Sequence, residues 1–328
     1  MRLQQKHAKF ERRVANNLQT NGSLLDENWA RFLKEHRFLV GISLDGPREL
    51  HDRLRVTKRG EPTFDKVFAA TQLLHRFRVP FNTLTCVNRY NATHPLDVYR
   101  FLRREVGSTY IQFIPIVEPR GFETIAPQKW DNAKLPITGT PEARPGSPTS
   151  VVTDWSVDPE EYGYFLCKIW DEWQNRDIGK VFVNFCETLI VQHMGLPSQT
   201  CTYSEACGKG VAIEHDGSTY ACDHYVYPEY RRGSVLAKPL GDMVFGPEQV
   251  RFGYAKSEAL PRYCRKCFYL KDCWGECPKN RFVRAPDGEP GLNYLCPGLR
   301  RFFRHAAPNA EKIAARIRLS PVKHLSRI

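Results

Sequence analysis

The sequence contains no long apolar run. Nowhere among its 328 residues do apolar side chains continue unbroken for the length of a membrane span, which needs about 18 residues. The first seven residues, M-R-L-Q-Q-K-H, also lack the apolar segment of a secretory signal. We therefore expect a soluble, cytoplasmic protein with no membrane partner.

Acidic residues are in the minority, but the excess positive charge is not gathered in one place. There are 48 Lys and Arg against 36 Asp and Glu, a formal net charge of +12. Basic residues cluster only mildly, at residues 300–304 and 312–327, and two thiolate-bound iron–sulfur clusters would lower the net charge to roughly +8. We do not expect a nucleic-acid partner, because such proteins concentrate basic side chains in a patch. Retention on DNA with a steep salt dependence would reveal one.

Cysteine is absent before residue 86 and is concentrated in the second half of the chain. Eight of the eleven cysteines lie between residues 201 and 296. Their spacing is Cys201-x5-Cys207-x14-Cys222, then 41 residues, then Cys264-x2-Cys267-x5-Cys273-x3-Cys277-x18-Cys296. Such clustering in a long, non-secreted chain indicates metal ligands rather than disulfides.

Three interpretations of these cysteines compete. Two structural zinc sites or two [4Fe–4S] clusters would each need four thiolates per site, and the ligand count does not separate them. The third is a set of unrelated buried thiols, which have no reason to bunch in this way. Cys86, Cys167 and Cys186 lie apart, in apolar runs, and we interpret them as core thiols.

Short apolar runs alternate with amphipathic segments in the first half of the chain. Apolar runs closed by turn residues predict strands, and apolar residues at helical spacing predict helices. The predicted strands are residues 14–18, 38–44, 79–87 and 110–116, and the predicted helices are residues 63–77, 95–104, 158–176 and 181–194. A capping box at residues 23–26 is expected to start another helix. This alternation predicts an α/β fold with a parallel sheet, as in a whole or partial barrel, with its chemistry at the C-terminal ends of the strands.

The pattern fails between residues 118 and 156, where Pro, Gly, Thr and charged residues dominate. A segment of this length without periodicity is an insertion, either disordered or a substrate-facing loop. Beyond residue 196 periodicity is weak, which is typical of a region held together by metals rather than by a large core.

The cysteine region resembles a known domain. The eight clustered cysteines, with Gly217 ahead of Cys222, resemble the SPASM domain of radical S-adenosylmethionine enzymes, which carries two auxiliary [4Fe–4S] clusters. The segment V-G-I-S-L-D-G-P at residues 40–47, with H-D and an arginine following it, resembles the barrel of the same enzymes.

Two further strings narrow the resemblance. Q-T-N-G at residues 19–22 and C-D-H-Y at residues 222–225 are similar to the anaerobic sulfatase-maturating enzymes, which oxidise a Cys or Ser of a sulfatase to Cα-formylglycine. The likeness runs from about residue 17 to about residue 304.

The resemblance implies a domain organisation and a pairing of ligands. Residues 1–195 would form a partial (β/α)6 radical S-adenosylmethionine barrel that lacks its first strand–helix units and carries the insertion at 118–156. Residues 196–305 would form a small, irregular SPASM domain with two auxiliary [4Fe–4S] clusters, and residues 306–328 a basic tail. By the same resemblance, one cluster is held by Cys201, Cys207, Cys222 and Cys277, and the other by Cys264, Cys267, Cys273 and Cys296.

Asp223 is the catalytic residue that the resemblance implies. The family places its general base directly after a cluster ligand, where a carboxylate takes a proton while an electron leaves through the metal. The alternative is a carboxylate that binds local backbone in a turn. We interpret His224 and Tyr225 as structural residues near the pocket.

Four residues resemble contacts to S-adenosylmethionine. Ser43 and Arg55 would bind the amino-acid end of the cofactor, since a hydroxyl and a guanidinium suit its carboxylate. Gln19 and Asn21 would reach the cofactor from a strand end. The alternatives are that Ser43 only ends a strand and that Arg55 pairs with Asp52.

Two motifs of the family are absent from the printed sequence. It has no C-x3-C-x2-C triplet, which would hold a third cluster, and no Gly-Gly-Glu-Pro. The sequence predicts four strands, whereas the family's barrel has six. The chain therefore resembles an enzyme that begins mid-domain. Either the printed sequence starts late or the truncation is real. We expect that the chain as printed does not cleave S-adenosylmethionine. Binding of S-adenosylmethionine and of a third [4Fe–4S] cluster is expected only in a complete enzyme.

The function that the resemblance implies is oxidation of a sulfatase Cys or Ser to Cα-formylglycine. The partners would be an unfolded sulfatase polypeptide and a reducing electron donor such as flavodoxin or ferredoxin. The alternatives are a non-catalytic iron–sulfur protein for electron transfer or peptide binding, and another peptide-modifying SPASM enzyme, against which Asp223 argues.

Overall fold

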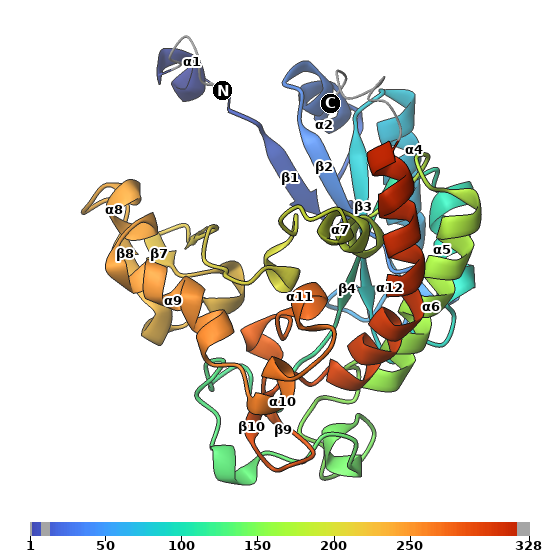
Figure 1. Cartoon of the computed structure of the whole chain (residues 1–328). Helices are drawn as coiled ribbons and strands as arrows, with labels where there is room; N and C mark the ends of the chain where they lie inside the picture. Colours follow the sequence, from blue (N-terminus) through green and yellow to red (C-terminus); the bar gives the residue numbers. More distant parts are fainter. Residues whose placement is uncertain (1, 8–13, 320–328) are drawn as a thin grey trace. The chain divides into compact units, whose positions relative to one another are not determined.

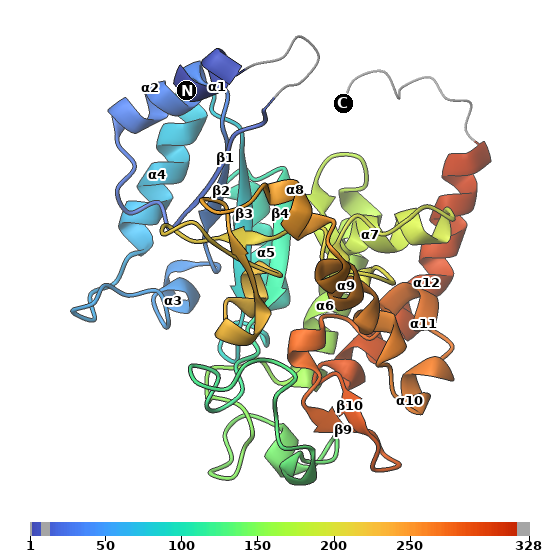
Figure 2. The same ribbon diagram turned by 90° about the vertical axis from the view of Figure 1, so that its left-hand side faces the viewer.

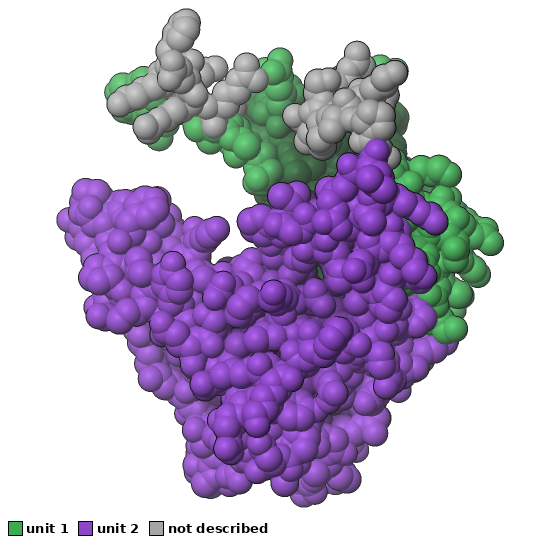
Figure 3. Space-filling view, viewed as in Figure 1, with its two compact units in different colours: residues 1–116, 168–185 green, residues 117–167, 186–328 purple. Residues whose placement is uncertain are grey.

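A computed structural model describes residues 2–7 and 14–319. The chain divides into two compact units, coloured separately in Figure 3. Unit 1 comprises residues 1–116 and 168–185, and unit 2 comprises residues 117–167 and 186–328. The domain boundaries expected at residues 195 and 305 stay predictions.

Unit 1 is built on a five-stranded parallel sheet in the order β1-β2-β3-β4-β5 (Figure 1). The register pairs Gln19 with Gly41 and Thr83 with Ile111. The strands are β1 (Asn17–Thr20), β2 (Leu39–Ser43), β3 (Phe81–Val87), β4 (Tyr110–Pro115) and β5 (Phe182–Val183). The predicted parallel α/β fold is therefore confirmed, and the strand ends that would carry chemistry lie along one edge of the sheet.

Helices connect the strands of unit 1, and their apolar faces are buried. In α4, Val67 and Leu74 are fully buried one above the other, which is the spacing of a helix that packs against a sheet. Figure 2 shows α2 and α4 on the same side of the sheet. The connecting helices are α2 (Glu27–Glu35), α3 (Arg48–His51), α4 (Phe64–Arg76) and α5 (Pro95–Arg104), preceded by the short α1 (Arg2–His7).

Three element predictions in unit 1 need correction. The first strand begins at Asn17 rather than at residue 14, and Val14 is exposed. The cap of α2 is Asp26, whose carboxylate accepts from the Trp29 amide, so the expected capping box at 23–26 does not start the helix. The single helix expected over 181–194 is divided into β5 and α7 (Asn184–His193), because Phe182 and Val183 pair with β4.

The insertion is an ordered part of unit 2. Its backbone accepts hydrogen bonds from two tyrosines of the cysteine-rich segment: Tyr227 Oη donates to Phe122 O and Tyr230 Oη to Pro127 O, both at 2.6 Å. It contains η1 (Asn132–Lys134) and η2 (Pro141–Ala143). Of the two alternatives for this segment, the disordered one is therefore wrong, and the substrate-facing loop stays a prediction.

The rest of unit 2 consists of short elements. The three-stranded antiparallel sheet is β6 (Ala212–Ile213), β7 (Ser218–Tyr220) and β8 (Arg231–Ser234), and β9 (Val283–Arg284) pairs with β10 (Pro290–Leu292). The short helices are η3 (Cys201–Tyr203), η4 (Asp223–Tyr225), η5 (Pro228–Tyr230), α8 (Leu240–Val244), α9 (Pro247–Glu258), α10 (Arg262–Arg265), α11 (Leu270–Cys273) and η6 (Pro278–Asn280).

Two long helices complete the chain. α12 (Cys296–Leu319) touches the first turns of α6 (Pro159–Arg176) so closely that a Cβ at Gly298 would lie 1.9 Å from Pro159 O. Residues 306–319 of the expected basic tail belong to α12, and residues 320–328 lie outside the described residues. No described helix combines the length and the apolar character needed to cross a bilayer.

Candidate functional site

The residues expected to bind S-adenosylmethionine lie at the C-terminal edge of the unit 1 sheet. Gln19 is near the end of β1 and Ser43 is the last residue of β2, its neighbour. Asn21 follows β1, where its Oδ1 accepts from the Ser23 amide at 3.1 Å and from the Ser23 hydroxyl at 2.9 Å. The sheet thus brings these polar groups to one edge, as parallel topology requires.

Arg55 is held at the same edge by an acidic partner that no sequence pattern singled out. Its Nε donates to Asp45 Oδ2 at 2.6 Å, and its Nη2 lies 3.4 Å from Cys86 Sγ. Burial opposes the charge of Arg55, but Asp45 raises the pKa of the guanidinium above its ordinary value. Arg55 is therefore a fixed cation.

The expected partner of Arg55, Asp52, has a different role. Its Oδ1 accepts from the amides of Thr63 and Phe64, both at 2.9 Å, and so caps α4. The pairing of Arg55 with Asp52 is wrong because Asp52 is committed to the helix start. The true partner, Asp45, belongs to the D-G-P string, which the sequence pattern marks only as the end of a strand.

The three cysteines outside the cluster region have different environments. Cys167 and Cys186 are buried, as expected of core thiols, and burial raises the pKa of Cys186 well above its ordinary value. Cys86 is only partly buried, and its sulfur contacts Arg55. The interpretation of Cys86 as a core thiol is therefore wrong.

The first group of predicted ligands gathers around η4 in unit 2. Cys222 Sγ, a carboxylate oxygen of Asp223 and a ring nitrogen of His224 all lie within 4.8 Å of one another. Cys277 Sγ lies 3.5 Å from His224 Nδ1. Burial raises the pKa of Cys207, Cys222 and Cys277, and the thiol of Cys201 adds to the effect at each of them. We call Cys201, Cys207, Cys222 and Cys277 set 1.

The second group lines a single cavity. The four remaining predicted ligands line this cavity together with apolar residues that include Leu270, Leu299 and Phe303. Burial raises the pKa of Cys264 to about 11 and of Cys273 to about 12, and that of Cys296 far above its ordinary value. We call Cys264, Cys267, Cys273 and Cys296 set 2.

The donor chemistry of both sets fits a metal centre. Four thiols around one apolar cavity is the ligand set of a [4Fe–4S] cluster or a structural zinc ion. Thiolates, not thiols, bind metal, so a metal must displace the thiol protons on binding. The ligands alone leave iron and zinc open.

Asp223 faces the thiol of its own neighbour. Cys222 Sγ donates to Asp223 Oδ1 at 3.0 Å. Partial burial acts to raise the pKa of this carboxyl, but the hydrogen bond from Cys222 and the nearby His224 lower it below its ordinary value. Asp223 is thus an ionised carboxylate beside the sulfur of a predicted metal ligand. Tyr225 is buried against Phe252 at a centroid distance of 5.0 Å, which confirms a structural position.

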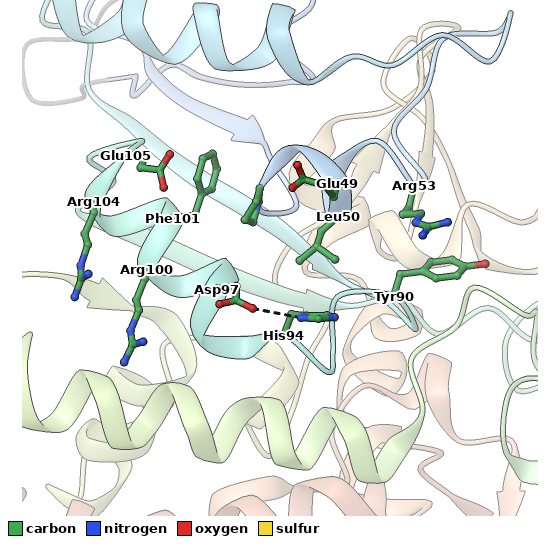
Figure 4. Close-up of a pocket in the computed structure, with 11 residues that line it drawn as sticks. Glu49, Leu50, Arg53, Tyr90, His94, Asp97, Arg100, Phe101, Arg104 and Glu105 are labelled. Carbon is green, nitrogen blue, oxygen red and sulfur yellow. Dashed lines mark hydrogen bonds and ion pairs between the residues drawn. The ribbon is translucent and has the colours of Figure 1, made fainter.

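A separate groove in unit 1 contains none of the predicted residues (Figure 4). It measures about 660 Å³ and lies between α3 and α5. Its charged side chains partly neutralise one another: His94 lies 3.3 Å from Asp97, and Arg100 binds Glu172 at 3.0 Å. Its lining also includes Glu49, Arg53, Arg104 and Glu105.

Residues 201–268 match the SPASM family, described as an iron-sulfur cluster-binding domain. This match favours iron over zinc for the cysteine sets. A parallel α/β sheet together with such a domain defines the class of protein, an α/β iron–sulfur protein of the partial-barrel type.

Curated relatives identify the family. The chain is 42% identical over 308 residues to the serine-type anaerobic sulfatase-maturating enzyme of Bacteroides thetaiotaomicron, covering 94% of this chain and 71% of that protein. It is 31% identical over 324 residues to the cysteine-type enzyme of Clostridium perfringens, covering 97% and 79%. The solved structure of native anSMEcpe with bound AdoMet and Cp18Cys peptide has a TM-score of 0.80 at 30% identity, covering 96% and 80%. The chain belongs to the anaerobic sulfatase-maturating enzymes, a radical S-adenosylmethionine family.

Proposed function

We propose that the protein, as its own cells make it, oxidises a Cys or Ser side chain of a sulfatase to Cα-formylglycine. The printed sequence has no C-x3-C-x2-C triplet, so we still expect the chain as printed not to cleave S-adenosylmethionine by itself. The observation that carries this proposal is the similarity to both serine-type and cysteine-type maturating enzymes over more than nine-tenths of the chain. The gathering of Asp223 with set 1 supports it, because the site combines a proton acceptor with metal-ligating sulfur.

In this proposal set 1 and set 2 each hold one [4Fe–4S] cluster. The four thiols of set 2 line one cavity, and in set 1 Cys277 lies within electrostatic range of Cys222 and Cys201. Both observations support the assignment, since each cluster needs four thiolates. When bound, such clusters supply an electron acceptor for oxidation of the substrate.

Asp223 would take the proton that the substrate thiol or hydroxyl loses. Carboxylates are ordinarily ionised at neutral pH, so Asp223 can accept a proton. The Cys222 thiol that now donates to it has no proton once it binds metal. That hydrogen bond is then lost, and the Asp223 oxygen becomes free for a proton from the substrate.

Ser43, Arg55, Gln19 and Asn21 would bind S-adenosylmethionine. The fixed guanidinium of Arg55 and the hydroxyl of Ser43 suit a carboxylate, and both lie at the sheet edge where such folds bind ligands. The substrate partner would be an extended sulfatase segment, as the peptide in the similar solved structure suggests. A flavodoxin or ferredoxin would supply reducing electrons.

The test uses the protein as its own cells make it, purified without oxygen. We expect iron and acid-labile sulfide for at least two clusters, and conversion of a sulfatase peptide to an aldehyde, detected by mass spectrometry and by labelling with a hydrazide. Bound iron without conversion would favour electron transfer or peptide binding instead. Absence of iron would refute the assignment of both cysteine sets.

A further inference from the structure

The three residues that join the two cysteine sets have an unusual backbone. Trp274, Gly275 and Glu276 lie between Cys273 of set 2 and Cys277 of set 1, and we call them the crossover link. Their φ angles are 48°, 66° and 48°, so all three are left-handed. Glycine adopts this conformation freely, but for Trp274 and Glu276 it costs roughly 1 kcal/mol or more each. Other contacts must therefore hold the link in place.

Arg281 supplies those contacts. Its Nη2 donates to Trp274 O at 2.9 Å and approaches Glu276 O at 3.5 Å, and its Nε donates to Gly275 O at 3.1 Å. One guanidinium thus collects every carbonyl of the crossover link. Its Nη1 also donates to Lys256 O at 2.6 Å, which ties the link to α9.

The crossover link also separates a ligand of set 2 from a ligand of set 1. Gly275 and Cys273 line the cavity of set 2. Cys277, at the other end of the link, lies beside His224 near set 1. A change in the link would therefore move a ligand of each set at the same time.

Arg281 brings a buried positive charge with it. Both Arg281 and Lys256 are buried, with 6% and 1% of their surface exposed, and neither forms an ion pair with a carboxylate among the described residues. The buried carboxylate of Glu276 instead accepts from the amides of Asn280 and Asn293, at 2.9 and 2.8 Å. Buried cations normally need an opposite charge nearby. Glu276 lies within electrostatic range of both Arg281 and Lys256. One carboxylate therefore faces two cations, and thiolate-bound clusters would supply further negative charge.

Arg281 contacts the backbone beside both sets. The Gly275 carbonyl that accepts from its Nε belongs to a residue that lines the cavity of set 2 together with Cys273. The Glu276 carbonyl that its Nη2 approaches at 3.5 Å belongs to the residue directly before Cys277 of set 1. One guanidinium therefore binds the backbone next to a ligand of each set.

The geometry points to Arg281 as a positioning residue shared by both iron–sulfur sites: it holds the left-handed crossover link, keeps Cys273 and Cys277 on separate sites, and places one positive charge beside each set. This inference rests on the proposed assignment of two clusters. A cation beside a cluster favours its reduced, more negative form, so Arg281 should raise both reduction potentials.

The test compares four variants of the protein as its own cells make it with the wild type. Arg281→Lys keeps the charge but cannot span three carbonyls, and Arg281→Gln loses the charge as well. Gly275→Ala keeps Arg281 but places a Cβ 2.7 Å from its Nη2. Arg251→Gln, which removes an exposed arginine of α9, is the matched control. Each protein is loaded with iron and sulfide without oxygen and titrated with a reductant while the cluster signals are followed by electron paramagnetic resonance.

We expect Arg281→Lys and Gly275→Ala to retain about half of the wild-type iron, because a displaced link removes a ligand from one or both sites. The clusters that remain should titrate at the wild-type potential in Arg281→Lys and at a more negative potential in Arg281→Gln. Arg251→Gln should match the wild type in both measurements.

Wild-type iron content and potentials in Arg281→Lys, Arg281→Gln and Gly275→Ala would overturn the inference and leave the cluster assignment intact. Equal reduction potentials in Arg281→Lys and Arg281→Gln would refute the part of the inference in which the charge of Arg281 raises the potentials. If the wild type binds no iron, the cluster assignment falls, and the inference with it. Arg281→Lys and Gly275→Ala decide the outcome if Arg281→Gln does not fold.

Discussion

Single side chains of this protein owe their chemistry to partners that are distant in the sequence. Arg55 is fixed by Asp45 and touches Cys86, which is 31 residues further along the chain. His51 is fully buried, where its Nδ1 accepts from the Asp45 amide at 3.3 Å and its Nε2 lies 3.1 Å from Thr63 Oγ1. These contacts convert ordinary residue types into fixed parts of the sheet edge.

His51 should make the stability of the protein depend on pH. Burial lowers its pKa from 6.5 to about 4 in the folded state. As pH falls from 6.5 to 4, the unfolded chain binds a proton here that the folded chain does not, so the free energy of unfolding falls by up to about 3 kcal/mol. Chemical denaturation at several pH values should show a shallower fall in His51→Gln than in the wild type. His215→Gln, which changes an exposed histidine, is the control, and equal slopes in all three proteins would contradict the prediction.

Asp223 should be required for turnover but not for metal binding. In Asp223→Asn the amide cannot accept a substrate proton, so we expect peptide oxidation to fall by about 10² or more, the usual contribution of a positioned base. Bound iron should stay at the wild-type level, since Asp223 is not one of the thiol ligands. Asp216→Asn, an exposed carboxylate in the same unit, should leave oxidation unchanged. Undiminished product in Asp223→Asn would remove this residue from the reaction.

At the scale of elements, close packing depends on residues whose role no sequence pattern reveals. Gly298 in α12 and Gly163 in α6 face each other so closely that a Cβ at Gly298 would also lie 2.8 Å from Gly163 N. Glycine is required there because the two backbones meet with no room for a side chain.

Gly298→Ala should destabilise unit 2. The added methyl group would lie 1.9 Å from Pro159 O, so the two helices must separate, at a cost of about 1–3 kcal/mol or more. Gly241→Ala in α8 is the matched control, because a Cβ there meets nothing within 4 Å and alanine favours a helix. Thermal unfolding followed by circular dichroism should show a lower midpoint only for Gly298→Ala. A midpoint equal to that of the control would show that the contact is not rigid.

On the scale of the whole molecule, the two units differ in what holds them together. Unit 1 has a sheet whose strands bury Val40, Ile42 and Ile111 completely. In unit 2, the segment from residue 201 to residue 295 has short elements around the two cysteine sets, and its sheets have three and two strands. A region with so little regular structure gains much of its stability from bound metal.

Removal of iron should therefore loosen unit 2 selectively. After chelation without oxygen, we expect amide hydrogen exchange to become faster over residues 201–296, while the strands of unit 1 stay protected. Hydrogen exchange followed by mass spectrometry measures both in one experiment, and the unit 1 strands serve as the internal control. Unchanged exchange across the cysteine region would mean that this unit folds without its metal.

The sequence by itself determined the parallel α/β fold and the grouping of eight cysteines at metal-ligand spacings. A short apolar run closed by turn residues, such as residues 39–43, is enough to predict a strand, and in the structure Val40 and Ile42 of this strand are buried while Leu39 is exposed. Short spacings show that these thiols lie in one region of the fold, but they do not show which thiols share a site, since Cys273 and Cys277 are four residues apart and belong to different sets. The pairing of the two cysteine sets, however, came from family resemblance and not from spacing.

Only the tertiary structure decided the contacts that join distant segments. β5 has two residues, too few for any periodicity, and exists because Tyr110 and Ile111 pair with it. Arg281 is one basic residue among 48 in the sequence, and it is distinguished only by the backbone carbonyls that the folded crossover link turns toward it. Backbone conformation and long-range pairing carry no local signal in the side-chain pattern, because they arise from packing between segments that the sequence places far apart.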